Sequence, residues 1–478
     1  MILVSQAFVT VTPEVGAVTS SRTGAVVEEV LTPLQTLVTV LTGDGPDVCL
    51  ITSAMGVQAS DVSYTIRHSA AAVLGIPMEH VLLFSTHNHC TPSLQHEPSA
   101  AYCAAARAPS ADNVTALGQE LVRGIAQVCE KLRARLQPVT VHWAVGHERR
   151  LTYNRKGHRA DGSTFFMREE DRVRYGRDYT GDIDDDVAVV AFLDRYDEPA
   201  GFLTSFTGHP VTAYHPERMV AFGEWPQLAT DRLGEYCGGV PVAFLQGCCG
   251  DVNSKRMLCG DTALSFRFGR YLGDTMVKAA RRLTASVRND LDFRAAGAKL
   301  PLAALPTGRV LEAELAEIDD FIARAKTGDE NTRSCVGLNF PRCLSPAYRG
   351  QLVAAIRPWT EWALRIRREG AAADLPRALE VPMAALRIGD VGIVGMPCEP
   401  FLGIGRQIKA GSPLPLAIPC GYMNDSFGYI PDGPNCGDRE YMSAFYRYTR
   451  FQAPYRRPAG DALARCGVRM LSQLTRGR

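Results

Sequence analysis

The chain has 478 residues, with 52 Lys and Arg against 51 Asp and Glu, so its formal net charge is +1. This balance excludes a global electrostatic field that would attract nucleic acid or an anionic membrane surface, and no nucleic-acid partner is expected. Hydrophobic residues make up 46% of the chain and charged residues 22%, a composition that excludes wholesale disorder.

The N-terminal ten residues predict a strand and lack the basic segment of a secretory signal. No apolar run reaches the roughly 18 residues of a membrane-spanning helix, so no transmembrane segment is expected. The 14 cysteines are scattered and include no Cys-x-x-Cys pair, which favours free thiols in a reducing compartment. We therefore expect a cytoplasmic protein.

Apolar runs rich in β-branched residues alternate with helical patterns along the chain. The predicted strands are residues 34–41, 48–52, 81–85, 139–145, 187–193, 202–206, 240–245, 379–388, 391–394 and 414–418. The predicted helices are residues 61–74, 113–136, 227–236, 264–283, 310–325, 348–368, 400–409 and 460–474. This alternation predicts an α/β fold with a large mixed sheet covered by helices. Residues 149–185 predict a long polar loop and residues 327–346 a second loop or linker, and we expect one large domain over residues 1–478.

Two histidines follow the strand predicted at residues 81–85. His87 and His89 would emerge from one face at its carboxyl end, where α/β proteins often place ligands, and an imidazole pair can begin a zinc site. A bare His-x-His is more often a pair of polar loop residues. A metallo-β-lactamase site would need an acidic residue where Thr91 stands.

Three more strands are followed by polar residues of the same chemical classes. His209 follows residues 202–206, Asp251 lies in the turn after residues 240–245, and Glu399 follows residues 391–394. Each has an ordinary alternative: a core histidine, a tight turn that needs glycine, or a helix-capping carboxylate. Taken together, the four strand ends predict a single site at one rim of a sheet.

The order of five short motifs resembles the neutral (non-lysosomal) ceramidase family, whose members are zinc-dependent amidases. The motifs are Thr86-His87-Asn88-His89, Phe206-Thr207-Gly208-His209-Pro210-Val211, Gly250-Asp251-Val252-Asn253, Pro397-Cys398-Glu399-Pro400 and Asn424-Asp425-Ser426-Phe427-Gly428-Tyr429-Ile430. The resemblance spans roughly residues 9–450 and implies the α/β catalytic-domain fold of that family.

The resemblance also implies a set of site residues. The implied zinc ligands are His87, His209, Glu399 and Tyr429. The implied catalytic residues beside them are His89, Arg155 and Tyr446, to which we add Asp251 from the glycine-rich turn. Two neutral imidazoles and a carboxylate hold Zn²⁺ with an open position, and such an ion makes hydroxide available near neutral pH and polarises an amide carbonyl.

The chain also departs from the family pattern. Asn253 stands where the family has a serine, so metal-activated water is favoured over a serine nucleophile. Cys90-Thr91-Pro92-Ser93 replaces the usual Ser-Gly-Pro-Gly, and about five extra residues lie around residues 433–437. We expect no C-terminal immunoglobulin-like domain, and a substrate other than ceramide.

These observations predict a zinc-dependent hydrolase that cleaves the amide bond of an N-acylated small molecule. An esterase, a lactonase or an acyl-transferring, amide-forming enzyme would use the same zinc site. Cys248 would be the nucleophile of a different mechanism. The alternative from another class is a binding protein that keeps the fold but has no catalytic activity.

Overall fold

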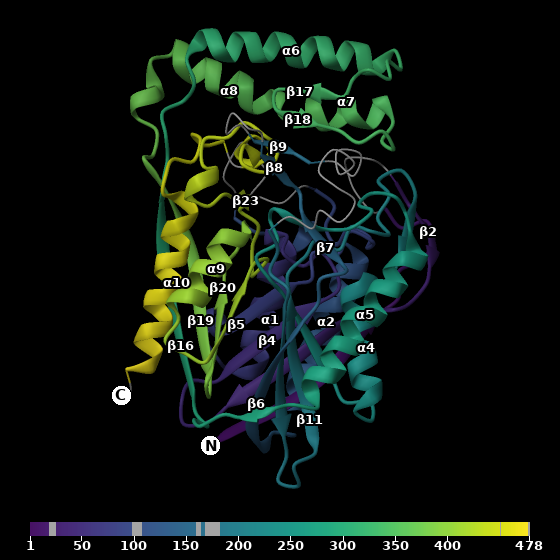
Figure 1. The fold of residues 1–478 in the computed structure, drawn as a ribbon, viewed down its shortest axis with the longest axis vertical. Coiled ribbons are helices and arrows are strands. Elements are labelled where there is room, and N and C mark those ends of the chain that lie inside the picture. The colour runs from purple at the N-terminus through teal and green to yellow at the C-terminus, as the bar shows by residue number, and fades with distance from the viewer. Residues whose placement is uncertain (19–24, 98–107, 159–163, 168–181, 450, 477–478) are drawn as a thin grey trace.

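Two β-sheets pack face to face in the computed structural model, with helices covering their outer faces (Figure 1). The structure describes residues 1–18, 25–97, 108–158, 164–167, 182–449 and 451–476. The mixed α/β fold predicted from the sequence is confirmed.

The larger sheet has nine strands, of which eight follow the order β13-β11-β10-β6-β1-β3-β4-β5. Neighbours are antiparallel except for the parallel pairs β4–β5 and β11–β13. The strands are β1 (Ile2–Val11), β3 (Leu34–Thr42), β4 (Val48–Ser53), β5 (Val81–Ser85), β6 (Gln137–His147), β10 (Asp186–Leu193), β11 (Pro199–Phe206), β13 (Val242–Gln246) and β15 (Thr284–Ala285), which pairs with β6.

The smaller sheet has the order β16-β19-β20-β22, with β20 and β22 parallel. Its strands are β16 (Leu291–Pro301), β19 (Ala378–Ile388), β20 (Val391–Gly395) and β22 (Leu416–Cys420). The sequence analysis missed β16, because four residues of this edge strand are exposed, Arg294 and Lys299 among them, and it has no continuous apolar run. Every predicted strand run overlaps a strand of one of the two sheets.

Strand alternation builds three hydrophobic layers. In β19, Leu386 and Ile388 point into the core between the sheets, whereas Met383 and Ala385 point to the opposite side. The outer face of the large sheet is covered by α1 (Ser60–Leu74), α2 (Ala116–Arg133), α4 (Glu224–Tyr236) and α5 (Thr262–Ala280). The outer face of the small sheet is covered by α9 (Leu402–Gly411) and α10 (Ala459–Thr475).

A further helical layer lies across one end of the sheets (Figure 1). It contains α6 (Gly308–Lys326), α7 (Pro346–Ala354) and α8 (Arg357–Arg368), and it shares its hydrophobic core with the small sheet. The single helix predicted over residues 348–368 is wrong, because Pro358 cannot continue a backbone hydrogen-bond ladder and instead stands in the first turn of α8. The helix predicted from Pro400 begins at Leu402.

Short strands and turns connect these layers. The remaining strands are β2 (Val27–Val30), β7 (Thr152–Asn154), β8 (Lys156–His158), β9 (Thr164–Phe166), β12 (Met219–Ala221), β14 (Val252–Ser254), β17 (Ser334–Cys335), β18 (Leu338–Asn339), β21 (Glu399–Pro400) and β23 (Tyr429–Ile430). The 3₁₀ turns are η1 (Met78–His80), η3 (Ala111–Asn113), η5 (Ala371–Ala373), η6 (Gly433–Asn435) and η7 (Phe445–Tyr448). The long loop predicted over residues 149–185 therefore contains three short strands, and its residues 159–163 and 168–181 lie outside the described residues.

The segment after β22 joins the two sheets directly. Asn424 exchanges hydrogen bonds with the backbone of Leu83: the Leu83 N–H donates to Asn424 Oδ1 at 2.8 Å, and the Asn424 N–H donates to the Leu83 carbonyl at 2.7 Å. The Ser85 N–H donates to the Tyr422 carbonyl at 3.2 Å. The carboxyl end of β5 is thereby fixed against the small sheet.

The described part of the chain contains no helix with both the length and the apolar character needed to cross a membrane. Every cysteine in the same ranges is a free thiol.

Glu224 is a buried carboxyl group beside the loop that follows β11. It is 0% exposed and lies at φ 53°, and it accepts hydrogen bonds from the backbone N–H groups of Ala213 at 2.8 Å and Trp225 at 3.0 Å. Burial raises its pKa to about 7 despite these donors. The group therefore keeps its proton in the folded protein over a pH range in which the unfolded chain loses it.

We expect Glu224→Gln to remove a pH-dependent loss of stability. Between about pH 4.5 and pH 7 the folded state binds more protons than the unfolded state, so the free energy of unfolding of the wild type falls as pH rises, by about 3 kcal/mol. Urea denaturation of both proteins at pH 5, 6, 7 and 8 measures this difference in slope. Parallel stability curves would show that Glu224 is ionised throughout.

Candidate active site

Four separate chain segments bring their side chains to one point. His87 follows β5, at φ 62°, and His209 follows β11. Glu399 and Tyr429 are opposite each other in the parallel pair β21–β23. The two histidines thus extend from the large sheet, and the carboxylate and the phenol from segments associated with the small one.

The Glu399 carboxylate lies between the two imidazoles. Its Oε2 is 3.2 Å from His87 Nε2 and 3.0 Å from His209 Nε2, and the ligand atoms of these three residues lie within 4.8 Å of one another. The Tyr429 hydroxyl is 3.3 Å from His209 Nε2. All four residues that the sequence predicted as zinc ligands are therefore brought together.

Hydrogen bonds on the outer side of each imidazole fix its orientation. His209 Nδ1–H donates to the Cys249 carbonyl at 2.6 Å. The other ring nitrogen, Nε2, is therefore unprotonated and has a lone pair that could bind a metal ion. His87 Nδ1 faces the Gln58 carboxamide at 3.4 Å, and its ring stacks on Tyr422 with centroids 4.3 Å apart. Both Nε2 atoms face Glu399, as they would if all three residues bound one ion.

The charge states also suit a divalent cation. Burial and, to a smaller extent, the nearby Arg155 lower the pKa of His209 to about 3, so the imidazole is neutral at neutral pH. Burial alone would raise the pKa of Glu399, but His87 and His209 hold it well below its usual value. Neutral imidazoles and an ionised carboxylate are the forms that bind Zn²⁺, so these donors fit the ion.

Arg155 and His89 lie beside the four candidate ligands. Arg155 donates to the Gly250 carbonyl at 2.6 Å, lies 3.4 Å from His209 Nε2, and has its guanidinium 5.1 Å from the centre of the Tyr429 ring. His89 Nε2 lies 3.3 Å from His87 Nε2. Burial, with smaller effects from the neighbouring histidines, lowers the pKa of His89 well below its usual value.

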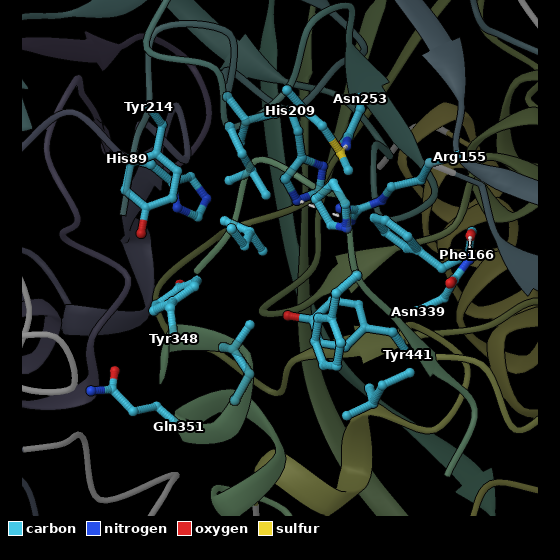
Figure 2. A pocket seen from close by; sticks show the side chains of 18 of the residues that line it. His89, Arg155, Phe166, His209, Tyr214, Asn253, Asn339, Tyr348, Gln351 and Tyr441 are labelled. Atoms are coloured by element: carbon cyan, nitrogen blue, oxygen red, sulfur yellow. Dashed lines mark hydrogen bonds between the residues drawn. The ribbon is translucent and has the colours of Figure 1, made fainter. Parts of the chain in front are cut away.

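A cavity of about 610 Å³ opens from this cluster toward the helical layer (Figure 2). Its inner end is polar, and Figure 2 shows His89 and Tyr214 on the opposite side from Arg155 and Phe166. Its walls are mainly apolar and include Val211, Met257, Leu258, Leu338, Phe340, Leu344, Leu352 and Ala355. A cavity of this size and composition suits an organic ligand with a substantial hydrocarbon part.

Two of the predicted catalytic residues do not line this cavity. Tyr446 packs against Trp359, with ring centroids 5.1 Å apart. Asp251 accepts hydrogen bonds from the backbone N–H of Leu402 at 2.7 Å and from Asn154 Nδ2 at 3.0 Å, so it caps α9 and supports the strand before Arg155. Burial raises the pKa of Asp251 to about 6.

Sequence reasoning missed Tyr441, which does line the cavity. Its ring lies 5.7 Å from that of Tyr429. Tyr441 lies five residues before Tyr446 in the same aromatic-rich segment, and only the path of the turn determines which tyrosine reaches the site. Tyr214 and Tyr348 also line the cavity, and no local sequence signal marked either of them.

The turn that carries Tyr441 is held by a buried lysine. Lys156 Nζ lies 3.0 Å from Glu440 Oε1 and 2.9 Å from Asp438 Oδ2, and it donates to Ser443 Oγ at 2.7 Å. The side chains of Lys156 and Glu440 are each 1% exposed. Because Lys156 directly follows Arg155, one short stretch of chain positions both the guanidinium and the Tyr441 turn.

A second group with metal-ligand chemistry lies at the surface. His147, Asp185 and Asp186 place one ligand atom each within 4.8 Å of the others, but His147 is exposed. Arg149 Nε lies 2.5 Å from Asp185 Oδ2 and neutralises part of its charge. The buried cluster around Glu399 is therefore the better candidate centre.

Replacing Lys156 tests how firmly this turn is held. Lys156→Met should lower the free energy of unfolding by about 3–5 kcal/mol, because it leaves Glu440 buried without its cation. Urea denaturation measures the loss. The matched control is Arg232→Met, which breaks the half-exposed pair with Asp274 and should cost less than about 1 kcal/mol. Equal losses in the two variants would contradict a special role for the buried pair.

Comparisons with known proteins show what this fold resembles. No family model and no curated protein sequence matches the chain. Among solved structures, a neutral ceramidase from Pseudomonas aeruginosa matches with a TM-score of 0.65 and 18% identity, over 99% of this chain and 74% of that chain. A structure described as ceramidase complexed with C2 matches with a TM-score of 0.66 and 17% identity, over 99% of this chain and 75% of that chain. At such low identity the likeness shows the fold alone, and it is the fold that the sequence motifs predicted.

Proposed function

We propose that this protein is a zinc-dependent hydrolase that cleaves the amide bond of an N-acylated small molecule. One observation carries the proposal: His87, His209 and Glu399 place their ligand atoms within 4.8 Å of one another at the end of an apolar cavity. The fold of the two ceramidase structures supports the same reaction class. The difference in sequence is large enough that the substrate need not be ceramide.

His87, His209, Glu399 and Tyr429 would hold the metal ion. When bound, Zn²⁺ supplies Lewis acidity and lowers the pKa of water toward ~7. Tyr429 is at present a neutral phenol, because burial raises its pKa well above the usual value. The nearby Arg155 acts in the opposite direction and favours a phenolate, the form in which tyrosine is a stronger ligand.

The other polar residues of the inner end would bind and orient the substrate. His89 is neutral at pH 7, so one ring nitrogen can accept a proton while the other donates one. Arg155 keeps its charge and stabilises negative charge that develops on a carbonyl oxygen. The apolar walls exclude water and hold the hydrocarbon part of the substrate.

Metal analysis tests the proposed centre. After dialysis against a mild chelator, the wild type should retain about one zinc ion per chain and His209→Ala very little, because a ligand has been removed. Elemental analysis measures both. His68→Ala, an exposed histidine on α1, is the control and should retain the wild-type content. Loss of zinc in His147→Ala but not in His209→Ala would place the metal at the surface group instead.

A substrate series tests the reaction. The zinc-loaded wild type should hydrolyse p-nitroanilides with acyl chains of four to twelve carbons, and Glu399→Gln should lower kcat/KM by more than about 100-fold, since it removes the ionised ligand between the imidazoles. Absorbance of released p-nitroaniline gives the rates, and circular dichroism checks that the variant is folded. Full activity in Glu399→Gln, or hydrolysis of the corresponding p-nitrophenyl esters alone, would contradict the proposed amidase.

A further inference from the structure

Aromatic side chains are concentrated around the cavity. Phe, Tyr and Trp make up 8% of the chain, but six of the 21 residues that line the cavity are Phe or Tyr. These six are Phe166, Tyr214, Phe340, Tyr348, Tyr429 and Tyr441. Three of them, Tyr214, Tyr348 and Tyr441, are only partly buried, so part of each residue remains accessible. The cavity therefore offers a ligand far more aromatic surface than the composition of the chain would supply.

The rings form two walls on opposite sides of the cavity. Figure 2 shows His89, Tyr214 and Tyr348 on one side, the first wall, and Phe166 and Tyr441 on the other, the second wall. In the first wall the ring centroids of His89 and Tyr214 are 5.0 Å apart. In the second wall the rings of Phe166 and Tyr441 are 6.0 Å apart and nearly perpendicular, at 87°. A flat ligand ring between the walls would meet aromatic surface on both sides.

Both walls begin at the candidate metal centre. In the first wall, His89 Nε2 lies 3.3 Å from His87 Nε2, and in the second wall the Tyr441 ring lies 5.7 Å from the Tyr429 ring. Burial raises the pKa of Tyr214 well above its usual value, so its ring is a neutral phenol at pH 7. A ligand ring held between the walls would therefore be attached close to the bond that reacts.

Helix α7 fixes the position of Tyr348 in the first wall. Tyr348, Gln351 and Leu352 are spaced by three and four residues, so they lie on one face of α7, and all three line the cavity. On the opposite face, Gly350 lies close against α6, where an added Cβ would be 2.9 Å from the Ala325 Cβ. Helix α7 is thus enclosed between α6 and the cavity. A wall fixed in this way suits a rigid, compact group better than a long flexible chain.

We propose that the space between the two walls binds an aromatic ring, so that the substrates of this protein are N-acylated small molecules with an aryl group close to the amide bond. The inference rests on the proposed function and narrows its substrate class. Aromatic rings in edge-to-face or offset contact gain free energy beyond that of burying their apolar area. A saturated ring gains only the burial, and a long alkyl chain also loses more conformational freedom on binding.

Binding of two matched pairs of ligands to the full chain tests the proposal. The first pair, N-butyl-2-phenylacetamide and N-butyl-2-cyclohexylacetamide, carries the ring on the acyl side. The second pair, N-benzylpentanamide and N-(cyclohexylmethyl)pentanamide, carries it on the amine side. Each ligand is titrated calorimetrically into protein that has been dialysed against a chelator, so that no amide is cleaved.

In at least one pair the phenyl ligand should bind about fivefold more tightly than the cyclohexyl ligand, an effect of the size of one aromatic pair. The pair that shows the preference identifies the side of the amide on which the ring lies. A cavity that selects by apolar burial alone would bind the saturated ring at least as tightly. Equal affinities or a preference for cyclohexyl in both pairs, or no binding of any ligand, would overturn the proposal.

One variant on each wall then assigns the preference to its residues. Tyr214→Leu and Tyr441→Leu should each weaken binding of the phenyl ligand and leave that of the cyclohexyl ligand almost unchanged, because leucine keeps an apolar surface but has no ring. Circular dichroism checks folding, and Tyr348→Leu or Phe166→Leu replaces a variant that does not fold. Tyr196→Leu is the matched control, because Tyr196 is 68% exposed in the turn between β10 and β11, and it should keep the wild-type ratio. A wild-type ratio in the variants of both walls would overturn the role of these rings.

Addition of Zn²⁺ to the same mixtures separates this inference from the proposed function. A preference for phenyl without hydrolysis of any amide would overturn the hydrolase and leave the aromatic site standing. Hydrolysis of the phenyl and cyclohexyl amides with equal kcat/KM, and with no difference in binding, would overturn only the aromatic site.

Discussion

The contact on which the site depends is the buried Glu399 carboxylate between His87 and His209. An ionised carboxylate is costly to bury, and the His209 Nε2 lone pair that faces Glu399 does not offset this cost, whereas a cation held by the three side chains would. The histidines come from the large sheet and Glu399 from a segment of the small one. The three residues meet only if the two sheets are packed face to face in the correct position. The inter-sheet core and the Leu83–Asn424 bonds maintain that position.

Much of this arrangement could be predicted from the sequence. The strands of the central layers were apparent because their buried runs are apolar and β-branched. Tyr429 was implied only by the resemblance to the ceramidase motifs, but His87, His209 and Glu399 were apparent because each follows such a run. Their residue types also restrict the chemistry to a few metal sites. Local pattern and local chemistry were sufficient for these features.

The features that were missed depend on contacts between distant segments. Tyr441 and Tyr446 have similar sequence surroundings, and the Lys156–Glu440 ion pair holds the turn from which Tyr441 reaches the cavity. Asp251, which the sequence analysis placed among the catalytic residues, accepts a hydrogen bond from the Leu402 N–H at the start of α9, a partner that only the fold supplies. The split between α7 and α8 shows the converse, since Pro358 was a local signal that outweighed the helical pattern around it.

The bond between Leu83 and Asn424 also has a consequence for how the protein matures. It joins residues 341 positions apart, and the candidate ligands extend from residue 87 to residue 429. Contacts over such separations form late, because a long loop must close before they contribute. During synthesis the N-terminal half can build most of the large sheet, but it exposes two histidines without their carboxylate. The group of candidate ligands is complete only when residues up to 429 have left the ribosome, so metal uptake would report a late stage of the folding of this domain.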